Sequence, residues 1–287
     1  MFFKNSMVRE DLMHSHEKKL VRELENKAKV LRRRVIEMIV RAQSGHPGGS
    51  LSAADIMAVL FFHQLRIDSS NPKNPDRDRF ILSKGHAAPV LYAALAERGF
   101  FEPSWLVTFR QLGSKLQGHP DMTKTPGVEM TTGALGQGLS VALGMALGAR
   151  ILKRNFRVYV LLGDGEMDEG QVWEAALAAA HYKADNLTAI IDRNGLQLDG
   201  PTEKIIALSP LWEKWAALGW HVVEINGHSV EEILESLDTA MRVEGKPTVI
   251  VAHTVKGKGV SFMENRAEWH GQSPTLEEAE LALQELI

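Results

Sequence analysis

The chain of 287 residues contains no cysteine and no excess of positive charge. Without cysteine, disulfide bonds, thiolate metal sites and cysteine nucleophiles are excluded, so any bound metal must be held by oxygen or nitrogen atoms. The 33 Lys and Arg residues are outnumbered by 36 Asp and Glu residues, which gives a formal net charge of -3. Such a chain has no global positive field of the kind that attracts nucleic acids. We therefore expect no nucleic-acid partner.

Long hydrophobic runs are also missing from the sequence. The N-terminal segment, residues 1–40, lacks the apolar run and small-residue cleavage site of a secretory signal. The most apolar stretch, residues 139–152, spans about 14 residues and suits a core helix better than a membrane span. We expect a cytoplasmic protein with no membrane association.

No internal repeat, low-complexity tract or linker rich in Pro, Gly or Ser divides the chain. Its apolar content of 44% is sufficient for a large core. We therefore expect residues 1–287 to form a single domain. Basic and acidic residues alternate near the N-terminus, which is typical of a solvated helix face, and residues 1–25 are expected to form a helical extension.

From residue 158 onward, apolar strand-like runs alternate with amphipathic helix-like segments. The expected strands are 158–163, 187–194, 220–227 and 247–254, and the expected helices are 170–184, 211–219 and 229–245, the last with Ser229 as its N-cap. Continuous Val, Ile and Leu strands separated by helices predict an α/β fold, a parallel sheet with helices on both faces. In such sheets, ligands bind beyond the carboxyl ends of the strands.

Two polar motifs follow consecutive strands of this predicted sheet. Gly163-Asp164-Gly165 ends the first strand, and Asp192-Arg193-Asn194 ends the next. A Gly-Asp-Gly sequence alone is typical of a turn, but these two strand ends would place Asp164 and Asn194 at one sheet edge. With a backbone carbonyl from the loop after Asn194, they form an oxygen set suited to Mg²⁺ or Ca²⁺. Gly165 would let an anion approach the following helix N-terminus, so the pattern predicts a metal-bridged phosphate or diphosphate.

Gly-Asp-Gly followed by Asn after 28 intervening residues resembles the thiamine diphosphate signature. From about residue 39 to 274, the chain is similar to the N-terminal, diphosphate-binding half of transketolase. The blocks that carry the resemblance are "SGHPGGSLSAAD" (44–55), "DRFILSKGHAAPVLYAAL" (78–95), "LQGHPD" (116–121), "TTGALGQGLSVALGMA" (131–146), "GDGEMDEGQVWEA" (163–175), "DRNGLQLDG" (192–200) and "KGKGVSFMENRAEWHG" (256–271).

The resemblance implies the thiamin diphosphate-binding fold, with thiamine diphosphate and Mg²⁺, or alternatively Ca²⁺, as cofactors. The implied metal ligands are Asp164, Asn194 and the main-chain oxygen of Leu196. The implied cofactor contacts are His86, Gly133, Ala134, Leu135, Gly165, Asn194, Lys256 and His270. Within this set, residues 133–135 would line the aminopyrimidine side, whereas Gly165 and Asn194 would contact the diphosphate.

Three histidines lie on turns. His46, His86 and His119 each follow a glycine, and two of them precede a proline. A single such histidine is most often a capping or turn residue, but unperturbed imidazole titrates near pH 6.5 and suits proton transfer and hydrogen bonding to sugar hydroxyls. By resemblance, His46, His119 and His270 would bind the hydroxyls and carbonyl oxygen of a sugar donor, and His86 would lie at the reactive end of the cofactor.

The implied activity is transfer of a two-carbon ketol unit from a ketose phosphate to an aldose phosphate, as in the pentose phosphate pathway. In transketolases a glutamate of the second half of the enzyme activates the cofactor, and this chain stops before that half. Glu166 and Glu169 lie on the diphosphate side and cannot replace it. The resemblance therefore implies a separately encoded C-terminal partner subunit that carries this glutamate, in an α₂β₂ heterotetramer.

Other interpretations remain open from the sequence. A subunit of a thiamine-dependent 2-oxo acid dehydrogenase shares the Gly-Asp-Gly to Asn signature, although the "SGHPGG" and "SKGHAAP" blocks favour transketolase. A deoxyxylulose-phosphate-synthase-like activity would use pyruvate as donor. A non-catalytic subunit would keep only the metal and diphosphate contacts. Gly49 also replaces a serine common in animal transketolases, so the physiological sugars are left open.

Overall fold

The computed structural model describes residues 3–287, with side chains described from residue 18. Its centre is a five-stranded parallel sheet with the order β1-β2-β3-β7-β6. The strands are β1 (Arg79–Leu82), β2 (Val158–Gly163), β3 (Leu187–Arg193), β6 (His221–Asn226) and β7 (Thr248–His253). The predicted α/β class and its four strands are confirmed. β1 lies before residue 158, outside the alternating pattern from which strands were predicted.

Ten α-helices occur in the described part of the chain. They are α1 (Phe3–Ala42), α2 (Pro47–Ser52), α3 (Ala54–Val59), α4 (Ala88–Glu97), α5 (Gln137–Ile151), α6 (Gly170–His181), α7 (Thr202–Ile205), α8 (Leu211–Ala217), α9 (Val230–Arg242) and α10 (Leu276–Glu285). Ser229 caps α9 as predicted, because its side chain accepts a hydrogen bond from the Glu232 amide at 3.3 Å. A two-stranded antiparallel ribbon, β4 (Leu196–Gln197) with β5 (Gly200–Pro201), follows β3.

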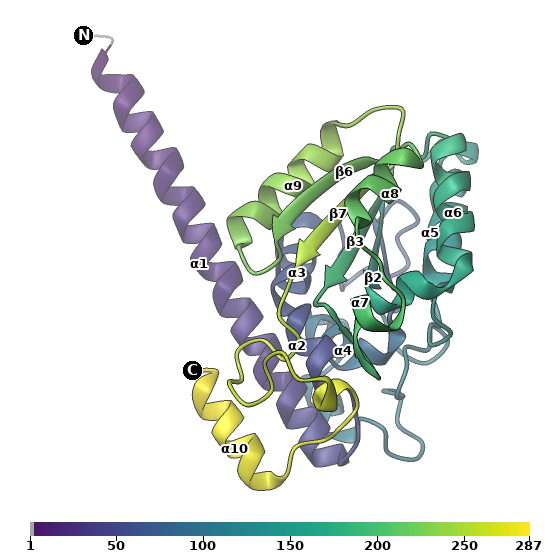
Figure 1. The fold of residues 1–287 in the computed structure, drawn as a ribbon. Coiled ribbons are helices and arrows are strands. Elements are labelled where there is room, and N and C mark those ends of the chain that lie inside the picture. The colour runs from purple at the N-terminus through teal and green to yellow at the C-terminus, as the bar shows by residue number, and fades with distance from the viewer. Residues whose placement is uncertain (1–2) are drawn as a thin grey trace.

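The alternation of side chains along each strand divides the core into two layers. On β2, Tyr159 and Leu161 contribute to a core shared with α1, α3, α4 and α9, whereas Val160 and Leu162 contribute to one shared with α5, α6 and α8. Figure 1 shows α1 and α9 on one side of the sheet and α5 and α6 on the other. Because both faces of the sheet are covered, the inner strands β2, β3 and β7 are buried and apolar over most of their length, as a parallel sheet requires, whereas the edge strand β6 carries exposed polar residues such as Glu224.

The apolar stretch at 139–152 forms most of α5 but is buried on one face only. Leu139 and Ala142 are fully buried, whereas Ile151 is 80% exposed and Gly144 lies on the exposed side. None of the described helices is long and apolar enough to cross a membrane. The stretch therefore forms a helix that packs on the core with one face and is exposed on the other.

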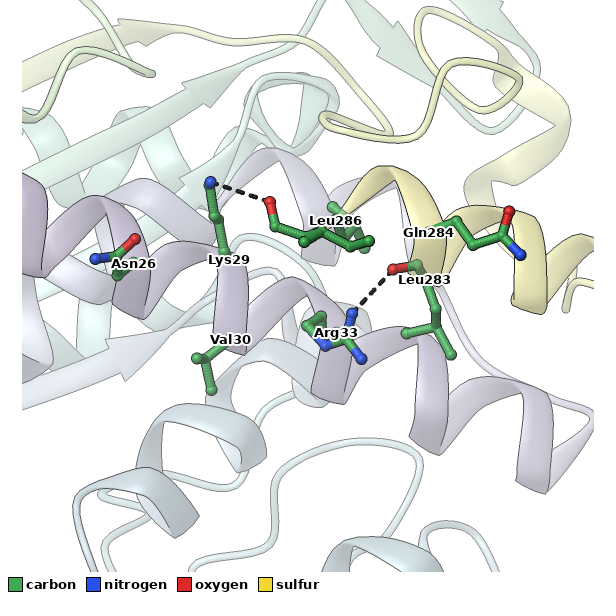
Figure 2. A pocket seen from close by; sticks show the side chains of 8 residues that line it. Asn26, Lys29, Val30, Arg33, Leu283, Gln284 and Leu286 are labelled. Carbon is green, nitrogen blue, oxygen red and sulfur yellow. Dashed lines mark hydrogen bonds between the residues drawn. The ribbon is translucent and has the colours of Figure 1, made fainter.

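The C-terminal helix α10 packs beside the second half of α1, far from the N-terminal end of that helix (Figure 1). The Lys29 ammonium donates a hydrogen bond to the Ile287 carbonyl at 3.1 Å, and the Arg33 guanidinium donates one to the Leu283 carbonyl at 2.9 Å. These cations satisfy carbonyls that the last turn of a helix leaves unpaired. Figure 2 shows the groove between the two helices, an open space of about 670 Å³ lined largely by apolar surface. Residues 1 and 2 of the expected extension over residues 1–25 lie outside the described residues, and the rest of that segment falls within α1.

Candidate functional site

The predicted metal residues meet at the carboxyl edge of the sheet. Gly163 of β2 is in register with Asp192 of β3, so the residues that follow each strand lie side by side. A cavity of about 320 Å³ opens at this edge. Its lining includes the predicted site residues His86, Leu135, Asp164, Gly165, Asn194, Leu196, Lys256 and His270, together with Gly49, Lys84, Glu166, Glu169 and Gln197. Most of the residues assigned by sequence therefore share one cavity.

Asp164 is 2% exposed and is held by two backbone amides. Its Oδ1 accepts a hydrogen bond from the Gly165 amide at 2.9 Å, and its Oδ2 accepts one from the Gly195 amide at 2.6 Å. Burial, with the neighbouring Asp192 carboxylate adding to it, raises the pKa of Asp164 to about 6. A buried carboxylate of this kind favours a bound cation, which would remove the cost of its charge.

The other two predicted oxygen ligands, Asn194 and the Leu196 carbonyl, belong to a chain of hydrogen bonds that ends at Lys256. The Asn194 Oδ1 accepts a hydrogen bond from the Leu196 amide at 3.1 Å, and the Leu196 carbonyl accepts one from the Lys256 ammonium at 3.0 Å. Lys256 Nζ also lies 3.0 Å from the Nδ1 atom of His270. Burial is the largest cause that lowers the pKa of Lys256, to about 8. The ammonium thus joins the predicted metal oxygens to the histidines of the cavity.

The donor chemistry fits a hard divalent cation. A carboxylate, a side-chain amide oxygen and a backbone carbonyl are ligands that Mg²⁺ and Ca²⁺ take, and such a site needs few carboxylates. The described residues contain no cluster of three or more His, Cys, Asp or Glu that could bind a metal. A Cβ at Gly165 would lie 2.8 Å from the Gln197 Cβ, and the buried Gln197 Oε1 has no partner among the described residues. Position 165 must therefore be glycine because Gln197 packs against it, and the Gln197 Oε1, which is an acceptor, suits a cation and not a phosphate oxygen.

Three of the four predicted histidines form one cluster. The ring centroids lie 5.3 Å apart for His46 and His86, 5.5 Å for His46 and His270, and 5.0 Å for His86 and His270. Burial is the main cause that lowers the pKa of His46 to about 4 and that of His270 to about 3. It also holds the pKa of His86 well below its usual value. These rings are therefore neutral at pH 7 and can both donate and accept hydrogen bonds.

Four of the predicted residues, His46, His119, Gly133 and Ala134, lie outside the lining of the cavity. His119 packs on Gly133, because a Cβ placed there would come within 3.3 Å of the imidazole ring. Gly133 has a φ of 153°, which L side chains rarely adopt. Burial lowers the pKa of His119, and the charge of Arg110 adds to this. His119, Gly133 and Ala134 thus flank the cavity on the side of Leu135, whereas His46 lies beside His86 and His270.

A buried ion pair behind the cavity was not predicted from the sequence. Lys84 and Asp192 have side chains 1% and 0% exposed, and the Lys84 ammonium donates a hydrogen bond to the Asp192 carboxylate and another to the Gly49 carbonyl at 2.8 Å. The Ser52 hydroxyl donates to the same carboxylate at 2.6 Å. Lysine is normally exposed, so the sequence gives no reason to expect Lys84 in the core. Its place in the "SKGHAAP" block was the one sequence signal that could have indicated a role in the site.

Glu166 contributes to the wall of the cavity. Its carboxylate accepts hydrogen bonds from the Gly136 amide at 2.9 Å and the Gly163 amide at 3.0 Å, and from the Ser83 hydroxyl. Burial raises the pKa of Glu166. These bonds tie the loop before α5 to the end of β2, so Glu166 has a positioning task within its own chain.

Comparison with known proteins gives a consistent family. The family model for the thiamine diphosphate binding domain of transketolase matches residues 24–286. A 6-deoxy-6-sulfo-D-fructose transketolase subunit from Clostridium sp. (strain MSTE9) is 46% identical over 264 residues, which cover 92% of this chain and 96% of that relative. An apulose-4-phosphate transketolase subunit from Phocaeicola vulgatus is 44% identical over 266 residues, covering 93% and 94%.

Full-length transketolases match over a part of their own length. Transketolase from Homo sapiens is 43% identical over 274 residues, which are 95% of this chain and 43% of the human protein. The structure of transketolase from Leishmania mexicana matches with a TM-score of 0.87 and 33% identity over 92% of this chain and 41% of that one. The chain thus spans less than half of these transketolases but nearly the whole of the two subunit relatives.

Proposed function

Because the chain belongs to the family of transketolase thiamine diphosphate binding domains, we propose that it is the cofactor-binding subunit of a two-chain transketolase. The enzyme transfers a two-carbon ketol unit from a ketose to an aldose. One observation carries this proposal: two kinds of group line a single cavity. Asp164 and its neighbours provide oxygen ligands for a divalent cation, and neutral histidines provide hydrogen bonds suited to a sugar. The relatives of the same length are named as transketolase subunits, which does not favour the 2-oxo acid dehydrogenase alternative.

The chain binds the cofactor at the carboxyl edge of its sheet. Asp164, Asn194 and the Leu196 carbonyl hold a divalent cation, for which we propose Mg²⁺. The Gly165 backbone contacts the diphosphate, and residues 133–135 border the aminopyrimidine. Thiamine diphosphate supplies the electron sink that lets the C2–C3 bond of a ketose break. All other tasks of this half of the site fall to the chain's own residues.

The neutral histidines orient the sugar and manage its protons. At pH 7 the Lys256 ammonium donates toward the Nδ1 atom of His270, so the ring proton of His270 is on Nε2. That N–H donates to a sugar oxygen, and the neighbouring rings of His46 and His86, which are neutral at this pH, can likewise donate or accept hydrogen bonds. A positioned acid or base of this kind contributes ~10²–10⁴-fold to rate. His119 binds a hydroxyl farther along the sugar.

The partner is a separately encoded chain that supplies the activating glutamate. Glu166 is occupied by two amides and a hydroxyl of its own chain, so it is not free for that task. Both relatives of the same length are named as subunits, which supports a two-chain enzyme. We propose an α₂β₂ assembly in the cytoplasm. The same names refer to a sulfosugar and to apulose 4-phosphate, so the family leaves the sugar open, and ketose and aldose phosphates of the pentose phosphate pathway are our first choice.

The test is turnover by the complete complex. The tagged chain is purified from its native extract with any partner of comparable size, and sedoheptulose 7-phosphate is measured from xylulose 5-phosphate and ribose 5-phosphate, with thiamine diphosphate and Mg²⁺. Parallel assays use apulose 4-phosphate, 6-deoxy-6-sulfofructose and pyruvate as donors. We expect ketol transfer from at least one sugar, lost in Asp164→Ala and kept in the surface variant Asp238→Ala. A complex that binds the cofactor but transfers no ketol unit from any sugar would leave a binding role and overturn the proposal.

A further inference from the structure

Arg110 has an unusual backbone conformation close to the histidine cluster. Its φ of 59° lies in the left-handed region, which is uncommon for a residue other than glycine. The conformation is held by the surrounding loop, in which the Arg110 amide donates a hydrogen bond to the Leu116 carbonyl at 2.9 Å. Such strained residues gather at functional sites, where the surrounding structure maintains a costly conformation. The question is what its side chain does there.

The guanidinium group lies between two segments, residues 44–46 and the Gly118 turn. Its Nη1 donates a hydrogen bond to the Ser44 hydroxyl at 2.6 Å, and its Nη2 lies 3.4 Å from the Nδ1 atom of His46. Its flat face rests on Gly118, where a Cβ would come within 3.0 to 3.1 Å of the Nε, Cζ and Nη2 atoms. The Nε atom is buried without a partner among the described residues. Contacts from two sides thus fix where the guanidinium points.

The contact with His46 determines which ring nitrogen carries the proton. A guanidinium can only donate, so the Nδ1 atom that faces Arg110 must accept, and the proton of the neutral ring is on Nε2. The Nε2 edge of the ring is turned toward Gly271, whose Cβ would lie 3.5 Å from it, and thus toward His270. Lys256 and His270 repeat the arrangement, since the Lys256 ammonium faces the Nδ1 atom of His270 at 3.0 Å. Each cation leaves its histidine an N–H at Nε2.

We propose that Arg110 is a positioning residue of the ketol-transfer site, which holds the His46 ring in place and fixes its neutral tautomer with the proton on Nε2. The inference rests on the proposed function, because the N–H so presented is the donor to a sugar oxygen. Arg110 is not among the residues that line the cavity. It acts on the reaction through His46.

The charges around His46 agree with a ring that stays neutral. The groups that face it are the Arg110 guanidinium, the imidazoles of His86, His119 and His270, and the Lys256 ammonium. All are cationic or neutral, and no carboxylate of a described residue is among the groups that shift the pKa of His46, so none opposes its lowering. Removing the Arg110 cation therefore weakens one reason for the ring to remain neutral and frees its Nδ1 atom to carry the proton.

The first experiment reads the tautomer directly and does not depend on turnover. The full chain is labelled with ¹⁵N-histidine, and the His46 signals are assigned with His46→Gln and followed by NMR from pH 8 to pH 5. We expect wild-type His46 to remain neutral with its proton on Nε2 over this range. In Arg110→Met we expect a mixture of tautomers and a His46 pKa shifted toward the ordinary value. A wild-type ring protonated at Nδ1, or a ring unchanged in Arg110→Met, would overturn the inference.

The second experiment uses the complex with its partner subunit. For Arg110→Met we expect kcat to fall ~10- to 100-fold, the size that misplacement of a positioned group can cost, with a smaller change in KM. The acidic limb of the kcat/KM profile moves to higher pH, and Arg110→Lys, which retains a cation beside Nδ1, restores part of the rate. Arg154→Met, at a surface arginine, is the matched control and leaves the profile unchanged. Equal rates and pH profiles in Arg110→Met and the wild type would contradict the role.

The two experiments separate the inference from the proposed function. A wild-type complex that transfers no ketol unit refutes the proposed function, whereas the NMR titration still decides whether Arg110 sets the His46 tautomer. If the complex turns over normally and the tautomer and pKa of His46 are unchanged in Arg110→Met, the inference is refuted and the proposed function stands. Arg110→Lys also guards against misfolding, because it keeps the length and charge of the side chain that spans Ser44 and Gly118.

Discussion

The two halves of the site, the oxygen ligands at the sheet edge and the histidine cluster beside them, are built in different ways. The metal and diphosphate half depends on neighbouring strand ends, Asp164 after β2 and Asn194 after β3, which the register of the sheet brings together. The histidine half depends on loops that are far apart in the chain, with His46, His86 and His270 meeting only through tertiary packing. The position of the first half is therefore determined by the strand pattern and by backbone hydrogen bonds. In the second half, individual side chains such as Arg110 and Lys256 must hold the rings in place.

The Lys84–Asp192 ion pair connects the halves, and breaking it should have the largest effect. Lys84 precedes His86 by two residues, and Asp192 precedes Asn194 by two. Lys84→Met leaves a fully buried carboxylate without its cation, which typically costs ~3–5 kcal/mol of unfolding free energy. Urea denaturation of the full chain measures it, with exposed Lys73→Met as the control. A loss below about 1 kcal/mol, the size of a typical point mutation, would mean that the pair does not support the site.

Removing Asp164 should disable only the sheet-edge half. In wild type, thiamine diphosphate and Mg²⁺ at 100 times their dissociation constant add ~2.7 kcal/mol of stability. We expect Asp164→Ala to lose this gain, because the cation loses its only carboxylate, while the chain without ligand stays folded. Thermal unfolding with and without both ligands gives the measurement, and Asp238→Ala on α9 should keep the full shift. A shift that survives in Asp164→Ala would place the cation elsewhere.

His119→Ala should affect the opposite half. His119 lies outside the cavity lining, beside Gly133, so we expect a loss in kcat/KM of ~10², the lower end of the range for a positioned acid or base. The stabilisation by thiamine diphosphate and Mg²⁺ should remain, which distinguishes this variant from Asp164→Ala. His181→Ala, an exposed histidine at the end of α6, is the control for kinetics. Near-wild-type turnover of His119→Ala would remove His119 from the site.

The same contrast explains how much could be predicted from the sequence. The strands after residue 158 and the meeting of Asp164 with Asn194 follow from apolar periodicity and from the rule that ligands bind at the carboxyl ends of parallel strands. The histidines could be assigned only through the family resemblance, since no local rule brings loops together. The burial of Lys84 contradicts the usual exposure of lysine. The contact of Arg110 with His46 joins residues 64 positions apart and requires a left-handed arginine, which no sequence pattern signals.

Replacing Gly49 by serine should have the smallest effect. The variant tests whether a side chain can be added between the two halves of the site, beside Lys84 and His86. A Cβ at Gly49 would lie 3.6 Å from the His86 Nε2 and the Lys84 Nζ, an ordinary contact distance, and Gly49 has no positive φ that a side chain would strain. Because Gly49 is buried but borders the cavity, we expect the unfolding free energy of Gly49→Ser to change by less than about 1 kcal/mol, the size of a typical point mutation. The added hydroxyl comes near His86, so it should alter sugar preference. We expect the ratio of kcat/KM for two sugar donors to change by less than about tenfold, which is 1.4 kcal/mol at most. Destabilisation by more than about 1 kcal/mol, or loss of cofactor binding, would mean that Gly49 is required by packing and that its replacement of serine is not a matter of sugar preference.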